Sequence, residues 1–220
     1  MKLDISRIEQ ALSTDRFQAY VHWANGDRER ALELYRHNTQ VATTFYHPLQ
    51  TLEVCLRNGI HTQLSRTYGE RWYDNYSVVR MADQQSKIER AKSDLANEGK
   101  VETPGRIVAS LMFGFWTACF NERNQESMWI KAHLSSVFKY DGKGFQRKDA
   151  NRHITPLRHL RNRVAHHEPI LYMPLDEHYS TICMLIRRMN PDIARWAEQD
   201  YRFESVYDPG LASMASQSRP

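Results

Sequence analysis

Apolar residues recur at intervals of three and four along most of this 220-residue chain, which is the spacing of one face of an α-helix. Ile5, Ile8 and Leu12 begin the pattern, and a stripe from Leu49 to Ile60 continues it. The chain holds only 9 glycines and 8 prolines, too few turn-forming residues for a many-stranded sandwich or barrel. The sequence therefore predicts an all-α protein.

Capping residues and helix breakers divide the chain into the expected helices. Pro48 and the Thr155-Pro156 pair are each expected to mark a helix boundary, because proline cannot donate the backbone hydrogen bond of a helix interior. The segment 107–120 is apolar on all sides and is expected to be one buried helix. The predicted helices are 5–12, a short one from 14, 27–45, 49–68, 82–97, 107–120, 124–138, 157–168, 175–189 and a short one from 191.

Composition narrows the class of protein further. A hydrophobic fraction of 41% with 25% charged residues is that of a globular chain. Three widely spaced cysteines do not form a disulfide scaffold and fit a reducing cytoplasm. No apolar run reaches the roughly 18 residues of a membrane span, and the first residues lack the apolar stretch of a signal peptide. We expect a cytoplasmic protein with no membrane partner, a single domain over 1–207 and a flexible C-terminal tail over 208–220.

Positive charge is concentrated in one segment. The whole chain carries a formal net charge of +4, whereas residues 142–167 hold seven Lys or Arg and one Asp, a local net charge of +6. Four histidines in this segment would add charge as the pH falls. The pattern predicts a polyanion-binding surface, although a solvated basic face would give the same pattern. The residues that we expect to contact RNA are Lys143, Arg147, Lys148, Arg152, Arg158, Arg163 and His167.

Within this segment, one predicted helix carries groups suited to phosphate chemistry. Asn162 and His166 lie four residues apart and share a helical face, and Arg161 precedes Asn162. A guanidinium grips phosphate oxygens and an imidazole transfers protons near neutral pH. These two functions are the minimum for cleaving RNA without a metal. Alternatively, Arg161 and His166 only cap the C-terminal end of the helix, where cations are favoured.

The same chemistry bears on oligomeric state. One histidine cannot be both base and acid at the same instant. Two copies of this helix facing each other across a two-fold axis would supply both groups. The chemistry therefore suggests a composite site in a homodimer.

The motif residues resemble a known family. Residues 161–166, Arg-Asn-Arg-Val-Ala-His, fit the Arg-Asn-x-x-x-His signature of the HEPN superfamily, and the continuation His-Glu-Pro-Ile at 167–170 resembles its Abi-like (abortive infection) family. The segments 31–38, 52–58 and 106–116 are similar to the other blocks of that family in the same order. The resemblance covers residues 27–190.

The resemblance implies an all-α, HEPN-type helical bundle with additional N-terminal and C-terminal helices, usually dimeric. In active members it implies a metal-independent endoribonuclease that leaves a 2′,3′-cyclic phosphate and serves in phage defence or toxin–antitoxin systems. On this chain, Arg161 would bind the scissile phosphate, His166 would be the acid or base, and Asn162 would orient one of them. The implied partners are RNA, a second copy of the chain and an antitoxin protein or RNA.

Two other kinds of function stay open. The chain could be a non-catalytic HEPN protein that forms a ribonucleoprotein with a structured small RNA, or a protein–protein adaptor.

Glu53, Arg57 and Asn58 could support the catalytic helix or contact RNA, and a buried ion pair that sets helix docking would also explain them. His166 and His167 point about 100° apart on a helix and make a poor chelating pair, so we expect no metal and no cofactor.

Overall fold

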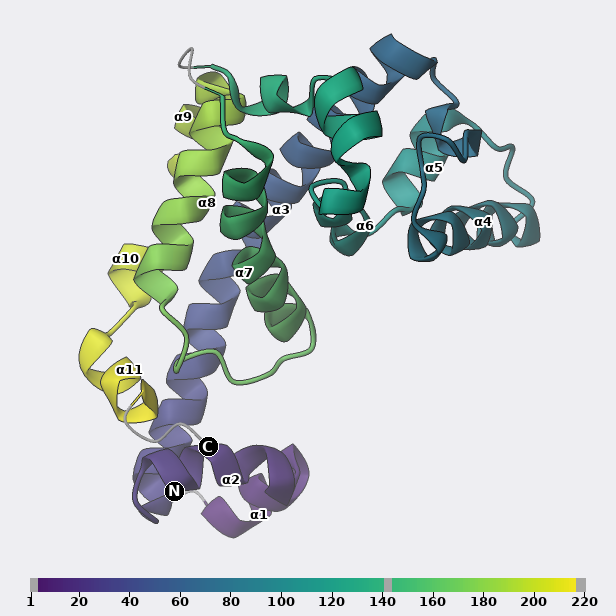
Figure 1. The fold of residues 1–220 in the computed structure, drawn as a ribbon. Helices are drawn as coiled ribbons and strands as arrows, with labels where there is room; N and C mark the ends of the chain where they lie inside the picture. The colour runs from purple at the N-terminus through teal and green to yellow at the C-terminus, as the bar shows by residue number, and fades with distance from the viewer. Residues whose placement is uncertain (1–3, 141–143, 217–220) are drawn as a thin grey trace. The chain divides into compact units, whose positions relative to one another are not determined.

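The computed structural model describes residues 4–140 and 144–216, and these residues form an all-α protein in which no strand occurs (Figure 1). The helices are α1 (Ile5–Leu12), α2 (Thr14–Trp23), α3 (Arg28–Tyr68), η1 (Trp72–Asp74), α4 (Ala82–Asn97), α5 (Pro104–Ser110), α6 (Phe113–Ala118), η2 (Glu122–Asn124), η3 (Gln125–Lys131), η4 (Leu134–Phe138), α7 (Arg147–Ala165), α8 (Leu175–Met189), α9 (Pro191–Glu198), α10 (Phe203–Val206) and α11 (Pro209–Ser216). The all-α prediction is confirmed.

Several helix ends lie where the capping residues predicted them. The Asp4 side chain accepts a hydrogen bond from the Arg7 backbone N–H at 3.2 Å and starts α1. Thr103 caps α5 in the same way, at 3.3 Å from the Arg106 N–H, and Asn190 caps α9. These side chains replace the missing partners of the first backbone N–H groups of a helix.

The predicted boundary at Pro48 is wrong, because α3 runs through this proline without a break. A proline inside a helix costs about 3 kcal/mol. Val41 and Phe45 before it, and Leu52 and Leu56 after it, are all fully buried. Because each buried side chain of this size contributes about 1.5–3 kcal/mol, burial on both sides outweighs the cost of the proline.

The predicted helix start at Thr155-Pro156 is also wrong. Helix α7 begins at Arg147 and contains Pro156. Ala150 and Ile154 are buried on the same stripe as Leu157, so packing extends the helix beyond the local capping signal.

The apolar segment 107–120 is two helices rather than one. The backbone is extended at Leu111 and Met112, between α5 and α6. Trp116 Nε1 donates a hydrogen bond at 2.9 Å to the Leu111 carbonyl, which satisfies a polar group at the break. The expected helix 124–138 is likewise divided into η2, η3 and η4, with left-handed His133 (φ 53°) between the last two.

The contacts group the described residues into two compact units, and the long helices α3, α7 and α8 contribute residues to both. The first unit draws its residues from Met1–Leu49, Leu160–Ser180 and Asp200–Pro220. The segment expected to be a flexible tail contains α11, in which Ala212 and Ala215 are buried. The single-domain prediction for 1–207 stays a prediction.

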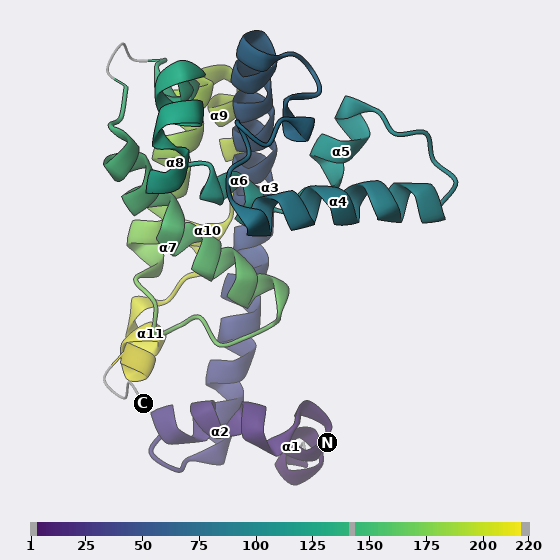
Figure 2. The same ribbon diagram turned by 45° about the vertical axis from the view of Figure 1, so that its right-hand side comes forward.

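The second unit draws its residues from Gln50–His159 and Thr181–Gln199. In this unit α4 lies beside α5, as Figure 2 shows. Its core is rich in aromatic rings: Trp72 packs against Phe115 and Trp116 with ring centroids 6.2 Å apart in both cases. η1 and α6 therefore supply an aromatic cluster of this interior, and α3, α7 and α8 add buried aliphatic residues to it.

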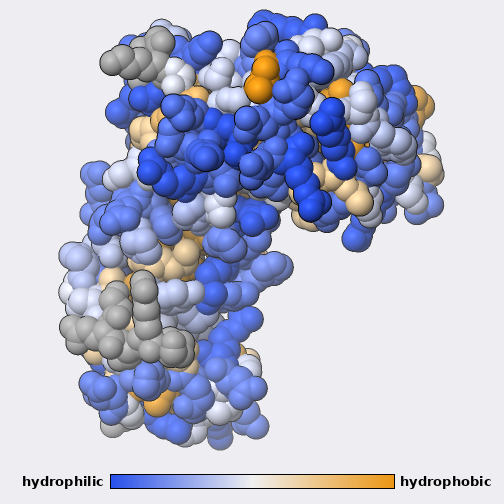
Figure 3. Space-filling view, in the orientation of Figure 1, coloured by the Kyte–Doolittle hydropathy of each residue, from blue (hydrophilic) through white to orange (hydrophobic). Residues whose placement is uncertain are grey.

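The visible surface is mostly hydrophilic, and hydrophobic residues on it form small separate spots (Figure 3). No helix within residues 4–140 and 144–216 is long and apolar enough to cross a membrane.

Candidate functional site

The last turns of α7 present the motif residues. Asn162 and His166 are exposed, and Arg161 is half-buried. The His166 N–H donates to the Asn162 carbonyl at 2.9 Å, so the helical bonding pattern continues through His166. Asn162 and His166 therefore share one face of the helix, as the sequence predicts.

Helix α7 ends in a Schellman motif directly after His166. The Glu168 N–H donates to the Arg163 carbonyl at 2.8 Å, and the His167 N–H donates to the Val164 carbonyl at 3.2 Å. His167 is in the left-handed conformation (φ 55°) that this motif requires. The chain consequently turns away from the helix axis as soon as the motif is complete.

Arg163 holds this turn in place. Its Nε donates to the Pro169 carbonyl at 2.9 Å, its Nη1 lies 3.1 Å from Glu168 Oε2, and its guanidinium lies 5.1 Å from the centre of the Tyr172 ring. These contacts explain the conformation of the loop between α7 and α8. We expected Arg163 to contact RNA, but in this structure its guanidinium is engaged by the protein itself.

A buried asparagine fixes the same loop to α3. The backbone N–H of Ile170 donates to Asn38 Oδ1 at 2.7 Å, and both residues are buried. Asn38 lies within one of the sequence blocks, yet sequence reasoning gave it no role. Its position on the apolar stripe of Leu34 and Val41 is the signal that could have indicated a buried polar contact.

Helix α2 supplies a second anchor for the loop. The ring centroids of Trp23 and Tyr172 lie 6.2 Å apart, and Tyr20 packs edge-on against Trp23 at 5.1 Å. Arg16 of the same helix donates from Nη1 to the His167 carbonyl at 3.4 Å. The sequence gave no signal for this contact, because 151 residues separate its partners.

The other residues expected to contact RNA have different environments. Arg147 is buried in the second unit, where it donates to Gln125 Oε1 at 2.9 Å and to the Phe120 carbonyl at 2.8 Å. The expectation of an RNA contact at Arg147 is therefore corrected: this residue links elements of the core. Among the others, the exposed residues are Lys148, Arg152 and His167. Arg158 is half-buried, and Lys143 lies outside the described residues.

The proposed supporting residues belong to the second unit, whereas the motif belongs to the first. Glu53 and Arg57 are half-buried and Asn58 is exposed. Arg57 Nε is buried and makes no hydrogen bond. The supporting role of these three residues stays a prediction.

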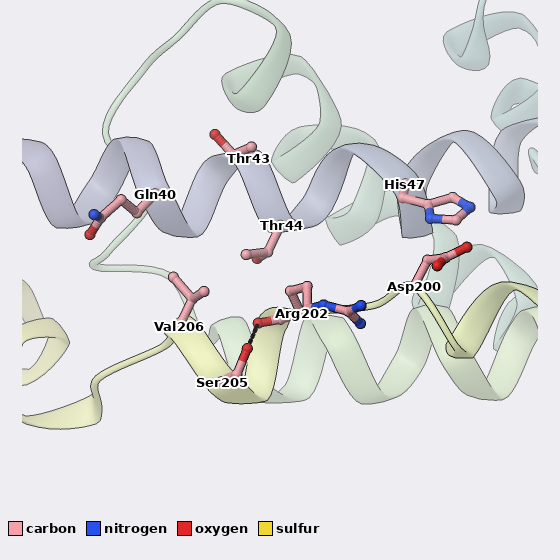
Figure 4. Close-up of a pocket in the computed structure, with 8 residues that line it drawn as sticks. All are labelled: Gln40, Thr43, Thr44, His47, Asp200, Arg202, Ser205 and Val206. Carbon is pink, nitrogen blue, oxygen red and sulfur yellow. Dashed lines mark hydrogen bonds between the residues drawn. The ribbon is translucent and has the colours of Figure 1, made fainter.

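A separate groove of about 630 Å³ lies in the first unit between α3 and the segment 200–206 (Figure 4). The hydroxyls of Thr43, Thr44 and Ser205 already donate to backbone carbonyls, at 2.9, 2.7 and 2.8 Å. They therefore offer mainly lone pairs to a ligand. The N–H groups that could bind an anion in this groove belong to Gln40, His47 and Arg202. Its lining residues are Gln40, Thr43, Thr44, His47, Asp200, Arg202, Ser205 and Val206.

Within the described ranges, 4–140 and 144–216, no group of three His, Cys, Asp or Glu side chains is arranged to hold a metal ion. No protein-family model, no curated protein and no solved structure matches this chain. The resemblance to the Abi-like family thus depends on the sequence motifs alone.

Proposed function

We propose that this protein is a metal-independent endoribonuclease with a HEPN-type fold, and that Arg161, Asn162 and His166 form its catalytic set. One observation carries the proposal: the two polar groups of the motif, Asn162 and His166, are exposed on one face of a helix end that Asn38 and Arg163 hold in place. An exposed imidazole and amide next to a guanidinium can reach a bulky polymer such as RNA. Buried side chains could not contact such a polymer.

The reaction is a transfer of the phosphodiester from one ribose oxygen to another. A base removes the proton of the ribose 2′-hydroxyl, and the 2′ oxygen forms a bond to phosphorus as the bond to the 5′ oxygen breaks. An acid gives a proton to that leaving oxygen, so a 2′,3′-cyclic phosphate and a 5′-hydroxyl result. Arg161 would neutralise charge on the phosphate oxygens, and His166 would transfer one of the two protons.

A second copy of the chain would supply the second proton-transfer group. Each chain brings one His166, whereas the reaction needs a base and an acid together. In a two-fold dimer, His166 of one copy would act as base while His166 of the other acts as acid. As a toxin-type enzyme in the cytoplasm, the dimer would need an antitoxin protein or RNA to hold it inactive between phage infections.

The test is cleavage of total RNA and defined transcripts in excess EDTA. We expect wild type to cleave and to leave cyclic-phosphate ends, and His166→Ala to bind RNA without cleaving it. Arg161→Ala should not cleave and should bind RNA more weakly, because it lacks the guanidinium that binds the phosphate. His159→Ala is the matched control, since His159 is an exposed histidine of the same helix outside the motif. It should cleave like wild type.

Three outcomes would refute the proposal. Equal cleavage by wild type and His166→Ala would place the activity outside this motif. Tight RNA binding without cleavage by any form of the dimer would instead support the non-catalytic RNA-binding protein, whereas absence of both would favour the adaptor.

A further inference from the structure

We infer that Arg16 of α2 forms a second phosphate-binding position beside the motif, which takes an RNA phosphate next to the scissile one. This inference rests on the proposed function and extends it to a residue far from the motif in sequence. Arg16 is exposed, and its Nη1 lies 3.4 Å from the carbonyl oxygen of His167. His167 directly follows His166, so this contact brings the guanidinium to the end of α7 that carries the motif.

The need for a second guanidinium follows from the helix dipole. The C-terminal end of a helix carries partial negative charge, which repels a phosphate placed there. Arg163 does little to offset this repulsion, because Glu168 lies 3.1 Å from its Nη1 and the Pro169 carbonyl accepts from its Nε. A phosphate near Asn162 and His166 therefore depends on Arg161 and on further cations, one of which a neighbouring helix can supply.

Arg16 is suited to this role by its free donors. A guanidinium has five N–H groups, and within the described part of the chain one of those of Arg16 makes a hydrogen bond. The remaining donors can grip phosphate oxygens in the forked geometry that arginine favours. The neighbouring Asp15 is also exposed, on the first turn of α2, and would weaken this attraction without removing the hydrogen-bond donors.

The backbone of Arg16 is held firmly. Phe17 and Tyr20, on the buried side of α2, have at most 1% of their surface exposed. The Tyr20 and Tyr35 rings lie 5.0 Å apart, which ties α2 to α3. Because Trp23 of the same helix packs on Tyr172 of the loop, α2 and the end of α7 keep their spacing. A side chain on such a frame can select the path of an RNA backbone.

The experiment measures RNA affinity against salt concentration in a His166→Ala background, which binds RNA without cutting it. The probe is a fluorescein-labelled single-stranded RNA of mixed sequence, in anisotropy titrations at several NaCl concentrations. The variants added to this background are Arg16→Gln, Arg16→Lys and the control Arg7→Gln. Arg7 is an exposed arginine of the neighbouring helix α1, paired with Asp4 at 3.2 Å.

We expect Arg16→Gln to raise the RNA Kd about fivefold, as the loss of one charged contact would. The slope of log affinity against log salt should become shallower by about 0.7, the value for one phosphate on a single strand. Arg16→Lys should keep most of the slope because it keeps the charge, and Arg7→Gln should match the parent. Circular dichroism of each variant checks that α2 remains folded.

The possible failures are distinguishable. If the parent binds RNA and Arg16→Gln matches Arg7→Gln in both Kd and slope, the role of Arg16 is overturned while the proposed function stands. If the parent and all variants bind no RNA, the proposed function fails and the role of Arg16 fails with it.

Discussion

Replacement of Asn38 by alanine tests how the motif-bearing end of α7 is held. In the folded protein, Asn38 Oδ1 accepts the Ile170 N–H at 2.7 Å, with Asn38 4% exposed and Ile170 fully buried. Alanine removes the acceptor and leaves a buried backbone N–H without a partner, which costs about 1–3 kcal/mol. We therefore expect the free energy of unfolding to fall by about 2 kcal/mol. For a chain of this length, that loss lowers the thermal midpoint by about 4–8 °C.

The assay is urea denaturation followed by circular dichroism, together with hydrogen exchange of the peptide that contains Ile170. The Ile170 amide should exchange faster in Asn38→Ala than in wild type, because its hydrogen bond is absent. Asn58→Ala is the matched control, an exposed asparagine on the same helix, and should change stability by less than about 0.5 kcal/mol. Identical urea midpoints and equal Ile170 exchange in both variants would refute the anchoring role.

Three further predictions concern other described residues. His167→Gly should raise the free energy of unfolding by about 1 kcal/mol, because glycine adopts the left-handed conformation (φ 55°) without strain; a lower urea midpoint would contradict this. Arg147→Ala should lower the free energy of unfolding by about 2 kcal/mol or more, because it removes one buried and one part-buried hydrogen bond, whereas exposed Arg152→Ala should stay near wild type; equal thermal midpoints would refute the buried role. Stability should fall as the pH drops below 6.5, since burial lowers the pKa of His37 despite nearby carboxylates, and the unfolded chain then binds more protons. Burial lowers the pKa of His61, His153 and His178 as well, so His37→Gln should remove part of this loss in urea titrations across that range, and an unchanged slope would exclude His37 as a source.

Helix ends set by capping residues could be predicted from the sequence because their bonds are local. Asp4 bonds to the N–H three residues later, Thr103 does the same, and Asn190 reaches the N–H groups two and three residues later. The residue types that make such bonds are few and their spacing is fixed. Tertiary packing leaves these three boundaries in place, although it overrides the same kind of signal at Thr155-Pro156.

The proline boundaries could not be predicted in the same way, because distant residues decide them. Pro48 and Pro156 each destabilise a helix interior when only the local backbone is considered, because proline lacks the N–H that the helix requires. The stripes on either side of each are nevertheless buried by tertiary packing, as Phe45 is against Tyr179 and Phe203. The anchors of the candidate site have the same origin: Asn38 meets Ile170 across 132 residues. The motif can be identified in a single sequence, but the distant residues that fix its position cannot.

In the basic segment, the sequence does indicate which cations are buried and which are exposed. Arg147 lies three residues before Ala150 and seven before Ile154, so it shares the buried stripe of α7. Lys148 and Arg152 lie on another side of the helix and are exposed. An arginine side chain can be buried when its guanidinium donates hydrogen bonds to carbonyl and amide oxygens. Its charge alone therefore does not place it at the surface. The helical phase of each basic residue, which the sequence does contain, therefore separates the buried Arg147 from the exposed cations of the same helix.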